Sequence, residues 1–260
     1  MANAYIGIDL GTSGCRAIAI DQQQNIIAHS QHPLSCSSNT EQDPDTHWKI
    51  VEQVLSELIP QCQHYEISSI AVDATSGSVL MTDSHGLPHT PILMYNDSRA
   101  IVQSEQIAKI APIESGAHGA SSGLAKLLYL QKQDNCPEDS YCLHQADWIN
   151  FKLGAPLGIS DENNALKTGY NPINRCWPEW IKQLKIVPIL PKVVAPTTVI
   201  GKLSPALCAQ FNLSTAPSIV AGTTDSIAAL VATGANHIGD AVTSLGSTLV
   251  VKLISDKPIF

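Results

Sequence analysis

The sequence predicts an α/β protein with a mixed sheet flanked by helices. Short apolar runs and amphipathic segments alternate along the chain, and the first runs follow one another directly. Runs joined by tight turns indicate antiparallel strands, whereas strands connected through helices indicate parallel ones. With 260 residues, 44% hydrophobic and 15% charged, the chain can bury a sizeable core in one large domain or two modest ones.

The opening elements are predicted from periodicity. Three Ile-rich runs, separated by Gly-Thr-Ser-Gly and Gln-Gln-Gln, indicate a β-meander at residues 4–10, 15–21 and 25–30. From Pro44 apolar residues recur at helical spacing, which predicts a helix with Asp45 or Thr46 as N-cap and Pro60 as its stop. Strands are expected next at residues 67–73 and 78–82.

The remaining elements follow from the same patterns. We expect helices at residues 98–110, 123–133 and 138–153, then a long loop rich in Asn, Gly and Pro at 156–178. A strand at 218–221, a helix at 225–233 and two strands within 241–254 complete the prediction. Because the last two strands have no following partner in the sequence, we expect the chain to be a truncated piece of a longer protein.

Charge and cysteine content exclude several classes of protein. Lys and Arg total 15 against 23 Asp and Glu, a net charge of -8, so no basic surface is available for nucleic acid or an anionic membrane. The seven cysteines are odd in number and lack a CxxC pair, which argues against a disulfide framework or a zinc site. Without a secretion signal or a long apolar run, we expect a cytoplasmic protein.

Two turns have the composition of phosphate-binding loops. Asp9 ends a strand and precedes Gly11, Thr12 and Ser13, whose backbone N–H groups and hydroxyls can surround a phosphate. The alternative is a plain hairpin whose Asp bonds its own turn. Gly246, Ser247 and Thr248 repeat the scheme near the other end of the chain. Two such turns facing one another would hold a polyphosphate from both sides.

Three further residues are candidates for a substrate site. Asp225 follows a Gly-Thr-Thr turn where a strand gives way to a helix, at the edge where open α/β sheets bind ligands. It could take a proton from a substrate hydroxyl, or serve only as a helix N-cap. Asp97 and Arg99 lie on a turn that could line a sugar site, or form a local ion pair.

The order and spacing of these motifs resemble the FGGY carbohydrate kinases of the actin, sugar kinase and heat-shock ATPase superfamily. The likeness covers essentially all 260 residues, through the segments 9–14, 41–44 with Trp48, 73–77, 94–99, 222–225 and 244–249. It implies a ribonuclease H-like mixed sheet, that is, an actin-like ATPase lobe, and an ATP-dependent kinase that phosphorylates a primary hydroxyl of a ketopentose or related polyol.

The resemblance also implies roles for residues. Asp225 would be the general base, Asp9 would organise Mg²⁺ through water, and the two turns would hold the β- and γ-phosphates of ATP. The sugar would contact Thr75, Ser76, Gly77, Asp97, Arg99 and Asp225. Xylulose kinases of the family carry a Met-His pair near the position of Ser76-Gly77, so this sequence is closer to the ribulose branch.

The family pattern predicts a sugar-binding lobe at residues 1–240 and the first hairpin of a truncated ATP-binding lobe at 241–260, and we expect this fragment alone to be inactive. An actin-like ATP-dependent switch and a sugar-binding module without kinase activity are the alternatives. Residues 73–99 argue against the switch, and Asp225 with both turns argues against the module. The sequence leaves the oligomeric state open, a homodimer included.

Two other features are assigned structural roles. His144 has no partner at metal-ligand spacing, so we expect it to lie at the surface or to be a satisfied core residue. The Trp177–Trp180 cluster is expected to pack the long loop against the body of the protein.

Overall fold

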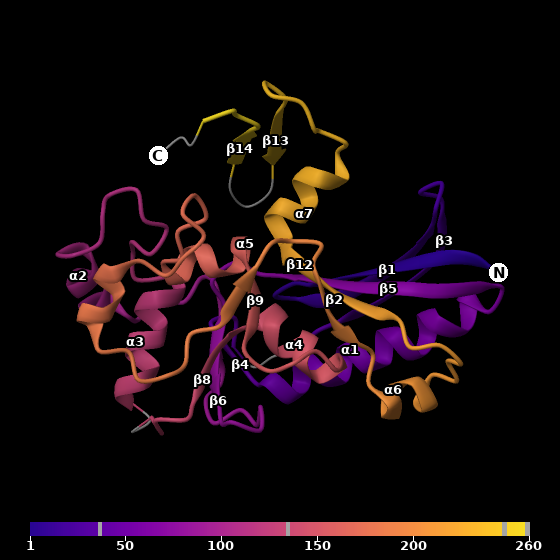
Figure 1. Cartoon of the computed structure of the whole chain (residues 1–260), viewed down its shortest axis with the longest axis horizontal. Helices are drawn as coiled ribbons and strands as arrows, with labels where there is room; N and C mark the ends of the chain where they lie inside the picture. Colours follow the sequence, from indigo (N-terminus) through magenta and orange to yellow (C-terminus); the bar gives the residue numbers. More distant parts are fainter. Residues whose placement is uncertain (36–37, 134–135, 246–248, 258–260) are drawn as a thin grey trace.

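The computed structural model describes residues 1–35, 38–133, 136–245 and 249–257. Its centre is a six-stranded mixed sheet in the order β11-β12-β5-β1-β2-β3 (Figure 1). The meander β1 (Ala2–Leu10), β2 (Gly14–Asp21) and β3 (Ile26–Pro33) is antiparallel. β5 (Tyr65–Ala74) runs parallel to β1, β12 (Ser218–Thr224) runs parallel to β5, and β11 (Val199–Lys202) is antiparallel to β12. The predicted mixed α/β architecture is therefore confirmed.

One face of this sheet carries the main core. α1 (Pro44–Leu58) packs against β2 and β3, and α4 (Gln145–Leu153) packs against β5 and β12, both below the sheet in Figure 1. Side chains of β1 are buried alternately at Ala4, Ile6, Ile8 and Leu10. Since successive strand residues face opposite sides, Asp9 lies on the face away from these two helices.

A second, smaller layer adjoins the first. β4 (Glu41–Gln42), β6 (Val79–Thr82), β7 (Ile92–Leu93) and β8 (Tyr141–His144) form a sheet in the order β4-β7-β6-β8. α2 (Ile101–Ala108) and α3 (Gly123–Gln133) pack against each other, and α3 packs against β6 around a separate apolar core.

Short elements connect these layers. η1 (Ile59–Cys62) continues from the end of α1, and α6 (Pro205–Gln210) lies between β11 and β12 in sequence. β9 (Ile159–Asp161) pairs with β10 (Lys192–Val194), and α5 (Glu162–Ala165), η2 (Leu166–Thr168) and η3 (Glu179–Leu184) lie between them in sequence.

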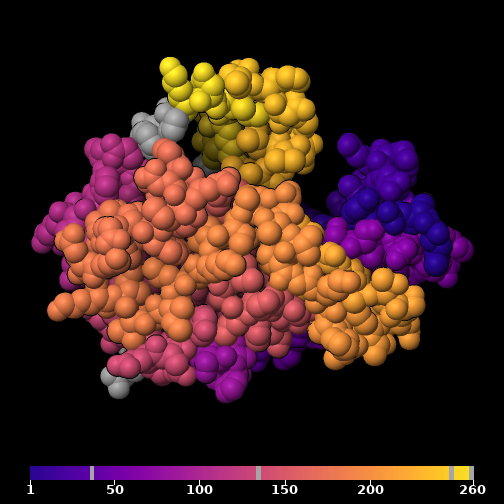
Figure 2. Space-filling model, viewed as in Figure 1, coloured from indigo at the N-terminus to yellow at the C-terminus, as the bar shows by residue number. Residues whose placement is uncertain are grey.

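The last described segment stands apart from the central sheet. α7 (Asp225–Ala232) leads to β13 (Ala241–Leu245) and β14 (Leu249–Leu253), which pair with each other as a separate two-stranded sheet. Figure 2 shows this yellow segment projecting above the body of the molecule. Its apolar side chains are largely exposed, including Leu245 at 84% and Leu249 and Val251 at 64%.

Several boundaries differ from those predicted. The predicted helix at 138–153 is wrong in its first part, because Tyr141–His144 pair with β6 and only Gln145–Leu153 are helical. The predicted loop at 156–178 contains β9, α5 and η2. The N-cap of α1 is Asp43, not Asp45 or Thr46, because the Asp43 carboxylate accepts from both of their backbone N–H groups.

Within the described residues no helix is both long and apolar enough to cross a membrane.

Candidate active site

Three carboxylates meet at one edge of the central sheet. In the parallel pairing of β1 with β5, Asp9 lies opposite Asp73. In the pairing of β5 with β12, Asp73 lies opposite Thr223, and Asp225 follows two residues later at the start of α7. Because the carboxyl ends of parallel strands meet at the same edge, residues far apart in sequence become neighbours here.

A glycine lets β12 lie this close to β5. The pairing shifts register between Val220 and Thr223, which is a bulge, and a Cβ added at Gly222 would collide with the carbonyl oxygen of Val72. Gly222 therefore permits the close backbone approach that brings Asp225 to the edge.

The central carboxylate of the three has the most perturbed acidity. Burial, the negative charges of Asp9 and Asp225, and a hydrogen bond with Asp9 raise the pKa of Asp73 to about 8. Its buried Oδ1 has no hydrogen-bond partner among the described residues. Asp73 is therefore mostly protonated at neutral pH.

Asp225 has a different environment. The N-cap of α7 is Thr224, so the predicted cap role of Asp225 is wrong, and Asp225 is the first residue of the helix. The backbone N–H of Ser226 donates to Asp225 Oδ1 at 2.7 Å. Burial and the charge of Asp9 raise the pKa of Asp225, against the opposing charges of Lys167 and Lys252. Lys252 also donates to the carbonyl oxygen of Ser226.

The predicted phosphate turn lies beside Asp9. Gly11 N–H donates to the Gly14 carbonyl at 3.0 Å, and Leu34 N–H donates to the Ser13 carbonyl at 2.8 Å, so the turn is held at both ends. Asp9, Gly11 and Ser13 line a cavity of about 330 Å³ together with Gly14, Cys15, Arg16, Gln31, His32 and Pro33. The second predicted turn, Gly246, Ser247 and Thr248, lies outside the described residues.

A cation that the sequence interpretation missed lies at this cavity. Arg16 is opposite Asp9 in the pairing of β2 with β1, and its guanidinium is 3.3 Å from Asp9 Oδ2. Both side chains are well exposed, so the pair contributes little to stability. The meander itself could have indicated it, since a two-stranded hairpin places Arg16 opposite Asp9.

The predicted sugar turn follows β5. Gly77 has a φ of +83°, and a Cβ there would lie 3.0 Å from Lys167 Cδ. Lys167 Nζ donates to the Ser76 carbonyl at 3.3 Å. Burial lowers the pKa of Lys167, and the nearby Asp225 opposes that shift. Lys167 is therefore a candidate site residue that sequence reasoning missed, because it belongs to a segment predicted to be loop.

Thr75, Asp97 and Arg99 are engaged with other protein groups. The hydroxyl of Thr75 is buried and donates to Gln145 Oε1 at 2.7 Å, so a sugar contact from Thr75 would have to come from its backbone. Arg99 Nε donates to Asp97 Oδ2 at 2.8 Å, and Arg99 Nη1 donates to Glu41 Oε2 at 2.7 Å. The ion-pair alternative for Asp97 and Arg99 is thus present, and their contact with a sugar stays a prediction.

A buried lysine lies beneath the turn at residues 94–99. Lys126 of α3 is fully buried and its Nζ donates to the Met94 carbonyl at 2.7 Å. Burial lowers its pKa to about 7, against the attraction of Asp97. Lys126 therefore fixes the Met94–Arg99 turn from inside the protein.

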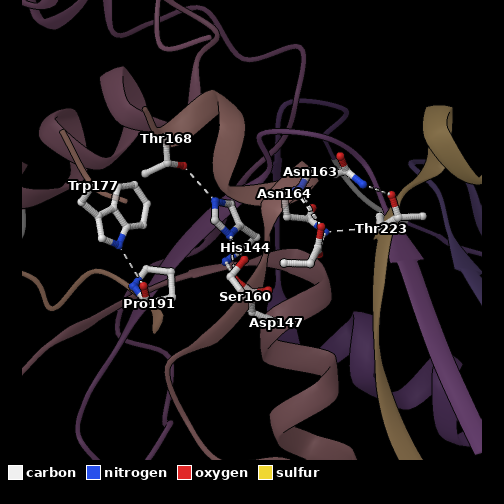
Figure 3. A network of polar contacts seen from close by, with 10 residues as sticks. His144, Asp147, Ser160, Asn163, Asn164, Thr168, Trp177, Pro191 and Thr223 are labelled. Atoms are coloured by element: carbon white, nitrogen blue, oxygen red, sulfur yellow. Dashed lines mark hydrogen bonds and ion pairs between the residues drawn. The ribbon is translucent and has the colours of Figure 1, made fainter. Parts of the chain in front are cut away.

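A buried network supports the segment that carries Lys167 (Figure 3). His144 Nδ1 donates to Asp147 Oδ2 at 2.6 Å, and its Nε2 lies 2.8 Å from Thr168 Oγ1. Ser160 Oγ is 3.0 Å from the same Nδ1. Of the surface and core roles predicted for His144, the structure shows the core role, and the network fixes Thr168, the residue next to Lys167.

The same view shows how α5 holds the strand that leads to Asp225. Asn163 Nδ2 donates to Thr223 Oγ1 at 2.8 Å, and Asn164 Nδ2 donates to the Thr223 carbonyl at 3.2 Å (Figure 3). Trp177 Nε1 donates to the Pro191 carbonyl at 3.0 Å, and Trp180 is partly buried against the smaller apolar core, so the predicted packing of the tryptophan cluster is confirmed. Asn163 and Asn164 were missed for the same reason as Lys167.

The donor set suits a hydrated cation more than a directly ligated one. Among the described residues no group of three His, Cys, Asp or Glu side chains is arranged to hold a metal ion. The negative charge of Asp9 nevertheless raises the pKa of both Asp73 and Asp225, and one buried oxygen of Asp73 lacks a hydrogen-bond partner among the described residues. Mg²⁺ keeps several waters and binds through one or two carboxylates plus phosphates, which fits this edge.

Comparison with known proteins gives one consistent result. The family model for the N-terminal domain of the FGGY family of carbohydrate kinases matches residues 4–232. A xylulose kinase from Staphylococcus epidermidis is 26% identical over 263 residues, covering 95% of this chain and 52% of that protein. The chain thus spans about half the length of the curated relatives it matches.

Solved structures have the same fold. A gluconate kinase from Lactobacillus acidophilus superposes with a TM-score of 0.86 at 19% identity, covering 100% of this chain and 55% of that one. A xylulose kinase from Rhodospirillum rubrum gives a TM-score of 0.83 at 22% identity, over 94% of this chain and 53% of that one.

Proposed function

Because the chain belongs to the FGGY family of carbohydrate kinases, we propose that the whole protein transfers a phosphoryl group from ATP to a primary hydroxyl of a ketopentose or related polyol. The observation that carries this proposal is the convergence of Asp9, Asp73 and Asp225 at one sheet edge, beside a glycine-hydroxyl turn. Phosphoryl transfer depends mainly on positioning and charge neutralisation, and this edge offers groups for both.

Asp225 is the proposed general base. It accepts the proton of the acceptor hydroxyl as that oxygen attacks the γ-phosphorus. Its raised pKa brings its basicity nearer to neutral pH, which makes it a better proton acceptor than an ordinary surface Asp. The charges of Lys167 and Lys252 oppose this rise in the pKa of Asp225 and so favour its ionised form.

The turn at Gly11, Thr12 and Ser13 is the proposed phosphate site. Its backbone N–H groups and hydroxyls are suited to the β- and γ-phosphates, and the turn forms one wall of the cavity beside Asp9. A bound Mg²⁺ would neutralise phosphate charge. Asp9 would hold that ion through water. The predicted contribution of Gly246, Ser247 and Thr248 to the same phosphates remains part of this proposal.

The proposed acceptor site includes Ser76, Gly77 and Lys167. Lys167 occupies the space that a side chain at position 77 would take. The proposed acceptor site therefore differs in shape from a site with a larger residue in place of Gly77. The Ser76-Gly77 sequence favours ribulose as the acceptor, whereas several curated relatives are xylulose kinases, so both ketopentoses are tested below. Asp97 and Arg99 are proposed to border the site while paired with each other.

We assign residues 1–240 to a sugar-binding lobe and residues 241–260 to the start of an ATP-binding lobe. The separate pairing of β13 with β14 and the exposure of Leu245 and Val251 support a boundary before β13. The apolar face of this hairpin would be covered by the remainder of that lobe.

The test is ADP release from ATP·Mg by the whole protein, with and without D-ribulose, D-xylulose, pentitols and glycerol. Acceptor-dependent ADP formation with a matching yield of sugar phosphate is expected. ADP formation at one rate with every acceptor would support the ATP-dependent switch instead. Sugar binding without any ADP formation would support the binding module.

A further inference from the structure

A line of buried polar side chains joins the two turns of the proposed active site. Gln42, His47 and Gln145 come from β4, α1 and α4, Thr75 directly follows β5, and each of the four is at most 3% exposed. Buried polar groups are costly unless they are bonded, and these four bond mainly to one another. We call Gln42, His47 and Gln145 the glutamine–histidine relay.

The two ends of the relay fix its hydrogen-bond directions. At one end the backbone N–H and the hydroxyl of Thr75 donate to Gln145 Oε1, at 3.3 and 2.7 Å. At the other end Gln42 Nε2 donates to the Thr12 carbonyl at 3.3 Å and to the Ser38 carbonyl at 3.2 Å. A backbone N–H can only donate and a carbonyl can only accept, so the orientation of both amides is determined.

These directions determine the state of the histidine between them. Gln145 Nε2 lies 3.0 Å from His47 Nδ1, and because the amide nitrogen donates, Nδ1 must accept. The ring proton is then on Nε2, which donates to Gln42 Oε1 at 2.6 Å. His47 is therefore neutral, and burial agrees by lowering its pKa to about 4. A second ring proton would face the amide hydrogens of Gln145.

We propose that the glutamine–histidine relay positions the phosphate turn at Thr12 relative to the sugar turn after Thr75, and that His47 is its central positioning residue. This inference rests on the proposed kinase function. Thr12 follows Asp9 at the end of β1, and Thr75 follows Asp73 at the end of β5. The relay is a direct polar connection between these turns, and it approaches both from the helix-covered side of the sheet.

The expected effect is on the chemical step. Transfer requires the acceptor oxygen and the γ-phosphorus to be aligned, and a misplacement of about 1 Å can cost roughly a hundredfold in rate. His47 contacts neither turn directly, so its loss should change alignment more than sugar affinity. Loss of such a supporting partner lowers activity by about 10- to 100-fold in comparable sites.

The experiment compares four variants of the whole protein in the kinase assay. H47L removes both ring nitrogens and should lower kcat about 10- to 100-fold with KM for the sugar changed less than about threefold. H47Q offers one donor and one acceptor, so kcat should return to within about threefold of wild type. Q42E keeps the acceptor for His47 but cannot donate to Thr12, and should lower kcat even if H47L does not fold.

V54A is the matched control. Val54 is fully buried on the same helix as His47, so the smaller side chain lowers the melting temperature without touching a polar group. Its kcat should equal that of wild type. The proposal is overturned if folded H47L or Q42E keeps wild-type kcat, or if V54A lowers kcat as much as they do.

A second readout does not depend on activity. The ¹⁵N shifts of His47 in the whole protein should show a neutral ring with the proton on Nε2 throughout pH 5.5–8. A ring that protonates within this range would overturn the relay. Absence of acceptor-dependent phosphorylation by the wild-type protein would instead overturn the proposed function, and with it the positioning role, while leaving the hydrogen-bond pattern measurable.

Discussion

Replacing Asp73 with Asn should make the protein more stable at alkaline pH. The pKa of Asp73 is raised from 3.8 to about 8, chiefly by burial and then by the charges of Asp9 and Asp225. Below pH 3.8 the folded and unfolded forms both carry the proton, so there is no penalty. As pH rises from 3.8 to 8 only the unfolded form releases the proton, and the stability of the wild-type protein falls.

The magnitude follows from the size of the shift. Each pKa unit corresponds to about 1.4 kcal/mol, so a shift of roughly four units sets a limit of about 5–6 kcal/mol above pH 8. The Asp73 side chain is only partly buried, so solvent screening lowers the penalty below this limit. We therefore expect D73N to raise the free energy of unfolding by about 2–4 kcal/mol at pH 8. The Asn amide can donate to Asp9 as the protonated Asp does.

Urea unfolding of the wild-type protein and D73N at several values from pH 4.5 to 8.5 measures this difference. It should grow steadily with pH. The control is D21N, because hydrogen bonds from Asn25 lower the pKa of exposed Asp21, and its stabilising effect is present at neutral pH and lost on acidification. A difference between wild type and D73N that is constant with pH, or that shrinks toward pH 8, would refute the reasoning.

Three further outcomes are expected. D225N should keep the melting temperature within a few degrees but lower kcat by roughly a hundredfold or more, as loss of a positioned base does; an unchanged kcat would remove it from the mechanism. K167M keeps the aliphatic stem beside Gly77 but removes a positive charge that lowers the pKa of Asp225. The acidic limb of the plot of kcat/KM against pH should therefore move to higher pH. The control variant K192M should leave this limb in place. G222A should cost at least about 2 kcal/mol of stability through collision with the Val72 carbonyl, while G7A, with open space at its Cβ, should not.

The elements best predicted from sequence are those whose periodicity is long. The helix at 123–133 has the bounds of α3, and α1 ends at Leu58, two residues before the predicted stop. The prediction failed at β8, whose four residues are too few to show a period of their own beside a longer helix. Pairing with β6 decides the conformation of that segment, and no local pattern carries that information.

Some residues of the candidate site could also be predicted from local sequence, and others could not. Asp9 and Asp225 could be predicted because each sits where a strand gives way to a turn or a helix within a short motif. Lys167 could not, because it reaches Ser76 from a segment that reads as loop. The relay could not either, since Gln42, His47 and Gln145 come from three separate elements and meet only in the folded chain.

The strand order explains why three aspartates of the same type would have different tasks. Asp73 lies on β5, between β1 and β12, so it is close to both other carboxylates and keeps its proton at neutral pH. A neutral Asp73 adds no negative charge between Asp9 and Asp225, so it does not repel either of them. Asp9 is then available for a hydrated cation and Asp225 for the acceptor proton. Because an Asn at position 73 would be neutral like the protonated Asp73, D73N should retain much of the activity, whereas D225N should not.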